Sequence, residues 1–130
     1  MLFSILLAVA LVPISQPVAP NTCVTQAQLA DVQPQGSTRD FQARHTIFDR
    51  DFAFSDAYFG ETGGAQTLWR RRASRWCAVP QSSVVYFDEA TFVRLGVPRP
   101  VAHRFRIEAG KYLEALVPYR TRADKAVDRP

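Results

Sequence analysis

The sequence has few of the side chains that bind soft metals. It contains two Cys, two His and one Met, and that Met is the first residue. Copper sites use thioether, thiolate or imidazole ligands. His45 and His103 are far apart in the chain, and the sequence has no His-x-His or Met-rich run. We therefore expect no metal and no other cofactor.

Motifs of the common hydrolases and nucleotide-binding proteins are also missing. The chain has no Gly-x-Ser-x-Gly, no His-Glu-x-x-His and no glycine-rich phosphate loop. Asp49, Asp51 and Asp56 are the remaining candidates for acid–base work or for holding a divalent ion. Asp49 and Asp51 flank Arg50 in what is most simply a charged loop. Asp56 lies among aromatic residues, where an arginine partner is the favoured explanation and a functional carboxylate the alternative.

The first twenty residues contain no ionisable side chain. Their apolar run, Leu2 to Val12, is too short to cross a bilayer as a helix. It predicts a secretory signal over residues 1–20, and hence a periplasmic or secreted protein, with an uncleaved N-terminal anchor as the alternative. In an exported chain, Cys23 and Cys77 most simply form one disulfide, although two buried free thiols are also possible.

At 130 residues the chain is long enough for one domain. We expect that domain over residues 21–117, followed by a polar, flexible tail over residues 118–130. The formal net charge of +4 suits loose attraction to anionic surfaces. It is too small for a dedicated nucleic-acid binder, so no nucleic-acid partner is expected.

Local patterns predict both strands and helices. Thr25 and Gln28 have capping-box spacing and predict a short helix that ends before Pro34. Phe52 begins a run in which aromatic and small residues alternate, which is typical of a strand. Asp88 is a candidate N-cap for a helix ending near Gly96. A second helical period then runs from residue 98 to residue 116.

Residues 67–80, TLWRRRASRWCAVP, are ambiguous. Their apolar residues recur at helical spacing, which by itself favours a helix. The same residues could instead form two strands with a tight turn near Ala73.

A family resemblance favours the hairpin. The order of four short motifs resembles small exported bacterial proteins sometimes labelled copper-uptake-system-associated, most of them uncharacterised. The motifs are DFAFSDA (51–57), GETGGAQTL (60–68), RWCAV (75–79) and LGVP (95–98). The resemblance covers about residues 46–107 and implies two strands and a turn over residues 67–80. It brings no catalytic residues.

Together these patterns predict an α+β fold with a short N-terminal helix, a small antiparallel meander over about residues 46–79, and two C-terminal helices packed on one face. The predicted function is a non-enzymatic exported accessory protein that binds another envelope protein. The alternative is a binder of anionic lipid or lipopolysaccharide through Arg70, Arg71, Arg72 and Arg75. An enzyme using the three aspartates is the weakest alternative.

Overall fold

A computed structural model describes residues 21–37, 39–60, 63–80 and 87–127, with side chains up to residue 119. The signal segment predicted over residues 1–20 lies outside this range. No helix among the described residues is both long and apolar enough to cross a membrane.

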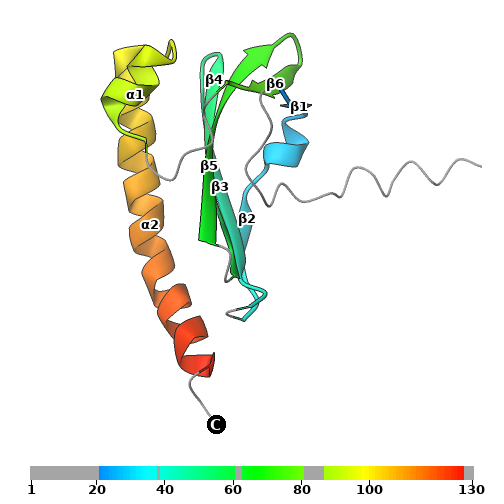
Figure 1. Ribbon diagram of the computed structural model, residues 1–130, viewed down its shortest axis with the longest axis vertical. Helices are drawn as coiled ribbons and strands as arrows, with labels where there is room; N and C mark the ends of the chain where they lie inside the picture. Colours follow the sequence, from blue (N-terminus) through cyan, green and yellow to red (C-terminus); the bar gives the residue numbers. More distant parts are fainter. Residues whose placement is uncertain (1–20, 38, 61–62, 81–86, 128–130) are drawn as a thin grey trace, which may run out of the picture.

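The main element is a six-stranded antiparallel sheet in the order β1-β6-β5-β4-β3-β2 (Figure 1). Its strands are β1 (Cys23–Val24), β2 (Val32–Gln35), β3 (Gln42–Asp49), β4 (Phe52–Phe59), β5 (Gly63–Arg72) and β6 (Arg75–Ala78). Strands β2 to β6 form a continuous meander. At the opposite edge of the sheet, β1 pairs with β6.

The predicted fold is therefore wrong. We expected a small meander over about residues 46–79, whereas the sheet has six strands and includes β1 and β2. The short N-terminal helix is not formed. Thr25 and Gln28 do make the hydrogen bonds of a capping box, but they lead into a single 3₁₀ turn over Ala27–Leu29. Strand β1 ends at Val24 and β2 begins at Val32, so pairing with β6 and β3 takes up both ends of this segment.

Residues 67–80 form a β-hairpin, as the resemblance implied and against the helical period. Trp69 pairs with Ala78, and Arg72 pairs with Arg75 across the turn. Ala73 in that turn has φ of 56°, a left-handed conformation that a helix does not allow. The helical period is misleading here because both faces of these strands carry buried side chains, with Leu68 in the core on the helix side and Trp69 in the core on the other side.

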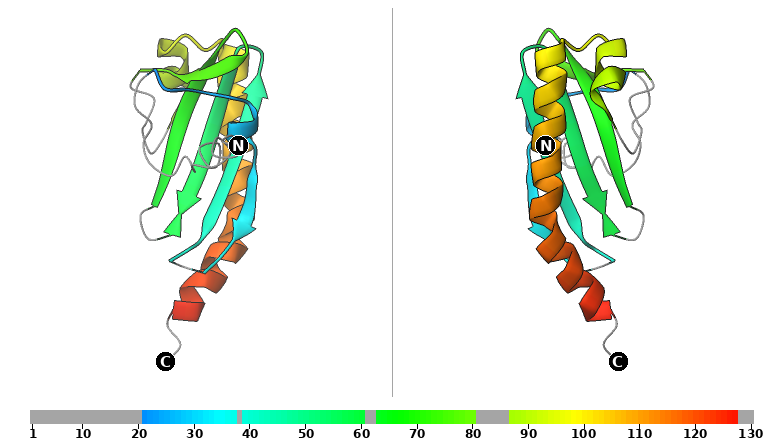
Figure 2. Two further views of the ribbon diagram at one scale, coloured as in Figure 1. Left: turned by 90° about the vertical axis from the view of Figure 1, so that its right-hand side faces the viewer. Right: turned by 90° about the vertical axis from the view of Figure 1, so that its left-hand side faces the viewer.

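Two helices follow the sheet. Helix α1 (Glu89–Arg94) starts at the predicted cap, where Asp88 Oδ1 accepts a hydrogen bond from the Thr91 amide at 2.7 Å. After Gly96, whose φ is +99°, α2 runs over Arg99–Val127 and lies along one face of the sheet (Figure 2). The helix continues through Pro118, which is the residue where we expected the flexible tail to begin. Figure 2 shows α2 bending toward its C-terminal end, and a proline inside a helix removes one backbone hydrogen bond.

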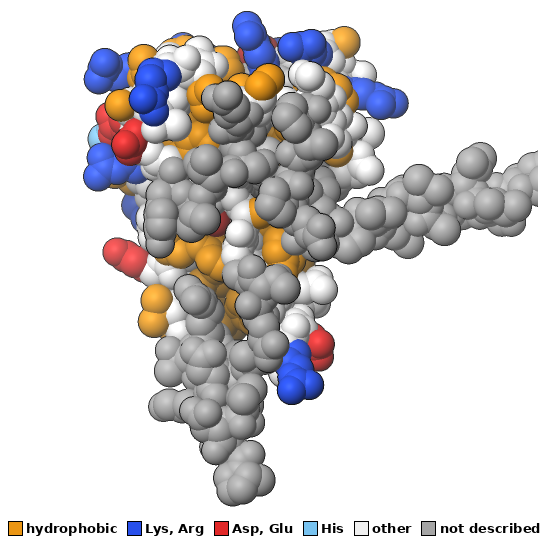
Figure 3. All heavy atoms as spheres, viewed as in Figure 1, with side chains coloured by type: hydrophobic (Ala, Val, Ile, Leu, Met, Phe, Trp, Pro, Cys, Tyr) orange, Lys and Arg blue, Asp and Glu red, His pale blue; other side chains and the backbone are white. Residues whose placement is uncertain are grey.

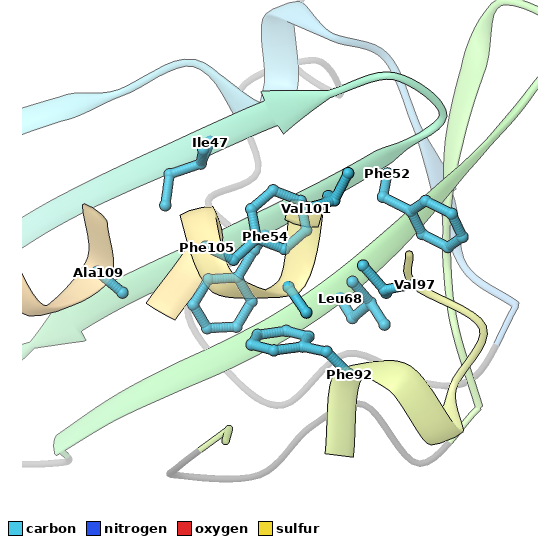
Figure 4. Close-up of a cluster of buried hydrophobic side chains, with 10 residues drawn as sticks. Ile47, Phe52, Phe54, Leu68, Phe92, Val97, Val101, Phe105 and Ala109 are labelled. Carbon is cyan, nitrogen blue, oxygen red and sulfur yellow. The ribbon is translucent and has the colours of Figure 1, made fainter. Parts of the chain in front are cut away.

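Both faces of the sheet carry buried apolar side chains. On the helix face, Phe54 packs against Phe92 and Phe105 with ring centroids 5.1 and 6.0 Å apart (Figure 4). On the other face, Trp69 and Trp76 pack with Leu29 from the 3₁₀ turn. The tryptophans therefore contact the N-terminal segment.

Candidate ligand-binding cleft

A cleft of about 240 Å³ lies where the edge strand β2 and its neighbour β3 meet the C-terminal half of α2. The residues that line it are Asp31, Val32, Gln33, Pro34, Arg44, His45, Tyr112, Ala115, Leu116 and Tyr119. The walls are apolar and aromatic, and the charged groups come from β3 and from the residue before β2. Concave sites with a few converging polar groups are the usual places where proteins bind ligands.

His45 is held in place by contacts from two other elements. Its Nδ1 lies 2.9 Å from Asp31 Oδ2, and its ring stacks on Tyr112 with centroids 5.1 Å apart. Asp31 is fixed in turn, because its Oδ1 accepts a hydrogen bond of 2.8 Å from the Thr46 amide. The His45 side chain is about 30% exposed, so part of it is accessible from the cleft. Sequence reasoning assigns no role to His45, because its two contacts come from residues far along the chain.

Arg44 fastens the segment before β2 to the sheet. Its Nε and one terminal nitrogen donate hydrogen bonds to the Ala30 carbonyl at 3.1 and 2.9 Å. Partial burial lowers the pKa of Arg44, and the nearby Asp31 carboxylate acts in the opposite direction. An arginine stays protonated in proteins, so this side of the cleft keeps a positive charge.

Asp56 is buried behind the cleft, with 2% of its surface exposed. It is the cross-strand partner of His45 on β3 and of Gln66 on β5. Burial raises the pKa of Asp56 to about 6, although hydrogen bonds from Gln66 and Tyr58 and the charge of His45 act to lower it. We expected an arginine partner, and the structure instead surrounds this carboxyl with an amide, a phenol and an imidazole.

Three buried polar atoms in the described part of the chain lack a hydrogen-bond partner, and all three belong to this region. They are Asp56 Oδ2, Gln66 Oε1 and the Tyr112 hydroxyl. Burial also raises the pKa of Tyr112, and the negative charge of Asp56 adds to that effect. Tyr112 therefore stays a neutral phenol, and burial makes Asp56 harder to ionise than a solvated aspartate.

The other two predicted carboxylates serve as structural ion pairs at the opposite end of β3 and β4. Asp49 Oδ2 lies 3.1 Å from an Arg104 nitrogen and ties α2 to the sheet. Asp51 Oδ1 lies 2.8 Å from Arg71. The strand register separates both from Asp56 by about half the length of β4, so the three aspartates do not converge on one site.

The four predicted arginines do lie together, at the β5–β6 hairpin. Arg71 pairs with Asp51, and the Arg70 guanidinium lies 5.7 Å above the centre of the Phe52 ring. Arg72 and Arg75 face each other across the turn. All four are exposed, but they are far from the cleft and form a separate surface.

The disulfide is confirmed: Cys23 and Cys77 are bonded at 2.06 Å and join β1 to β6. Both sulfurs are therefore unable to bind a metal. His103 Nδ1 lies 2.6 Å from Glu89 Oε1, so the two histidines have different partners. Within the described ranges, no three His, Cys, Asp or Glu side chains are placed to share an ion.

Comparison of the chain with protein-family models, with curated proteins and with solved structures finds no match.

Proposed function

We propose that this protein is a non-enzymatic, exported binding protein of the bacterial envelope, and that a side chain of a partner protein enters the cleft beside β2. The observation that carries the proposal is the combination of the cleft with exposed apolar residues on the same helix. The disulfide supports export, since disulfides persist in oxidising compartments.

The size of the cleft supports a side chain as its occupant. Pockets that enclose drug-sized ligands measure roughly 300–1,000 Å³, whereas this one measures about 240 Å³. Val32, Pro34 and Leu116 provide an apolar wall for the body of a side chain. Arg44 and His45 then lie where they can hydrogen-bond its backbone or its polar tip.

Apolar residues around the cleft support a protein partner. The large hydrophobic residues that are exposed in the described chain are Ile107, Val117 and Tyr119, and all three are on α2. Tyr119 lines the cleft and is 45% exposed, and Val117 is 57% exposed next to the cleft residue Leu116. An apolar anchor pocket bordered by exposed tyrosine is typical of protein interfaces.

Blocking the cleft tests the proposal. Ala115 is exposed and lines the cleft, so Ala115→Trp fills it without disturbing the core. Glu114→Trp is the matched control, since Glu114 is the neighbouring exposed residue and does not line the cleft. Envelope proteins retained by the immobilised chain are quantified for each variant. We expect one partner to be lost with Ala115→Trp and kept with Glu114→Trp.

Two outcomes contradict this function. One is that both variants retain the same envelope proteins as the unaltered chain. The other is that native mass spectrometry shows a small molecule bound to the unaltered chain and displaced by Ala115→Trp. Thermal unfolding of both variants, with midpoints unchanged, confirms that each has kept its fold.

A further inference from the structure

One end of the molecule concentrates its positive charge. The β5–β6 hairpin lies at the same end as the connection between α1 and α2, and Lys and Arg side chains gather there (Figures 1 and 3). We call this surface the arginine end, and its members are Arg70, Arg71, Arg72, Arg75, Arg94 and Arg99. All six are exposed. Six arginines less the paired Asp51 and the Asp88 carboxylate near Arg94 leave four positive charges, as many as the net charge of the whole chain.

The hairpin turn places two like charges directly opposite each other. Arg72 and Arg75 are register partners on either side of Ala73 and Ser74. Like charges at paired positions destabilise a sheet. Across the described residues, neither of these guanidiniums has an ion pair with a carboxylate. An external anion that contacts both would remove this repulsion.

Among the residues that the structure describes, the arginine end is charged but has little exposed aromatic surface. Trp69 and Trp76 are buried on the opposite face from α2, and the exposed Ile107 lies further along α2. Proteins that bind single-stranded nucleic acids stack bases on exposed aromatic rings. Insertion into hydrocarbon likewise needs exposed apolar anchors. The surface fits a partner that offers several phosphates on its outside.

We infer that the arginine end docks onto the phosphate groups of an anionic phospholipid surface. Guanidinium groups bind phosphate oxygens through two parallel hydrogen bonds. Several arginines at one end can contact neighbouring headgroups at once, while the cleft near the other end of α2 stays accessible. The contact is electrostatic and leaves both tryptophans in the protein core. This inference does not rest on the proposed partner, because it uses a different surface.

Vesicle binding tests the inference with the full chain. Cosedimentation is measured with vesicles of phosphatidylcholine alone and of phosphatidylcholine mixed with phosphatidylglycerol. The test variant is Arg72→Ser/Arg75→Ser. The control is Arg106→Ser/Lys111→Ser, which removes the same charge from exposed positions elsewhere on α2. We expect the test variant to bind the mixed vesicles about 30-fold more weakly, and the control to lose much less.

The expected binding weakens as salt rises and leaves tryptophan fluorescence unchanged, because both rings stay buried. Equal loss in the control variant would overturn the inference, since it would show attraction by net charge alone. Equal binding to phosphatidylcholine alone would also overturn it. Tighter binding to a duplex DNA fragment than to the mixed vesicles would assign the surface to nucleic acid instead.

Discussion

Asp56 is a buried carboxyl group whose protonation is linked to stability. Its pKa is about 6 in the folded protein, against an ordinary value of 3.8 for a solvated aspartate. Between these values the folded state binds more protons than the unfolded state, so stability falls as pH rises from about 4 to about 6. Above about pH 6 no further loss follows, and the total decrease in the free energy of unfolding is up to about 3 kcal/mol.

Asp56→Asn should remove this loss, because a neutral amide of the same shape has no charge to desolvate. Urea unfolding from pH 4 to pH 8 provides the measurement, with unaltered protein as the reference. We expect the unaltered protein to lose stability across the lower part of this range while the variant stays nearly level. Parallel pH profiles would show that the Asp56 carboxyl is already satisfied as an ion.

Residue contacts explain what sequence reasoning misses in the candidate site. Asp56 stands out in the sequence because a carboxylate in an aromatic run is unusual. Its neighbours are not predictable, because Gln66 belongs to another strand and Tyr112 to α2. His45 and Asp31 are likewise brought together only by strand pairing. A strand pattern tells which residues share a face, but not which distant residues complete a site.

At the scale of elements, the patterns succeeded where local chemistry decides the structure. The alternation in β4, the Asp88 cap and the Gly96 turn are all present as predicted. The prediction of an N-terminal helix was wrong because both ends of that segment pair as strands, β1 with β6 and β2 with β3. The hairpin at residues 67–80 was predicted only by the family resemblance. Leu68 and Trp69 are buried on opposite faces of the sheet, and a hydrophobic period detects burial on one face only.

Two glycines in the helical region provide a matched pair for stability measurements. A methyl group added at Gly110 or at Gly96 would contact nothing within 4 Å. Gly110 lies inside α2, so Gly110→Ala should stabilise the protein by up to about 1 kcal/mol. Gly96 has φ of +99°, so Gly96→Ala should destabilise it by about 1 kcal/mol or more. Chemical denaturation of both variants measures the two signs, and equal effects would contradict the conformational argument.

At the scale of the whole molecule, the disulfide fixes the edge of the sheet that β1 forms. The closed segment spans a sequence separation of 54. In the chain-entropy view, such a cross-link contributes about 4 kcal/mol by restricting the unfolded chain. Cys23→Ser/Cys77→Ser should lower the free energy of unfolding by about that amount.

Urea titration of this double variant, beside unaltered protein with and without reducing agent, checks the prediction. Reduction should destabilise the unaltered protein to the level of the double variant and leave the variant unchanged. A loss below about 1 kcal/mol would contradict the chain-entropy account, in which the cross-link acts by restricting the unfolded chain.

The order of strands also sets a sequence of events during synthesis. The ribosome makes β1 first, but its partner strand in the sheet is β6, which follows after the rest of the meander. Cys23 cannot form this disulfide before Cys77 has been made. Pairing of the first strand is the most distant contact of the sheet, and such contacts form slowly. The β1 edge of the sheet can therefore close only after every other strand has been made.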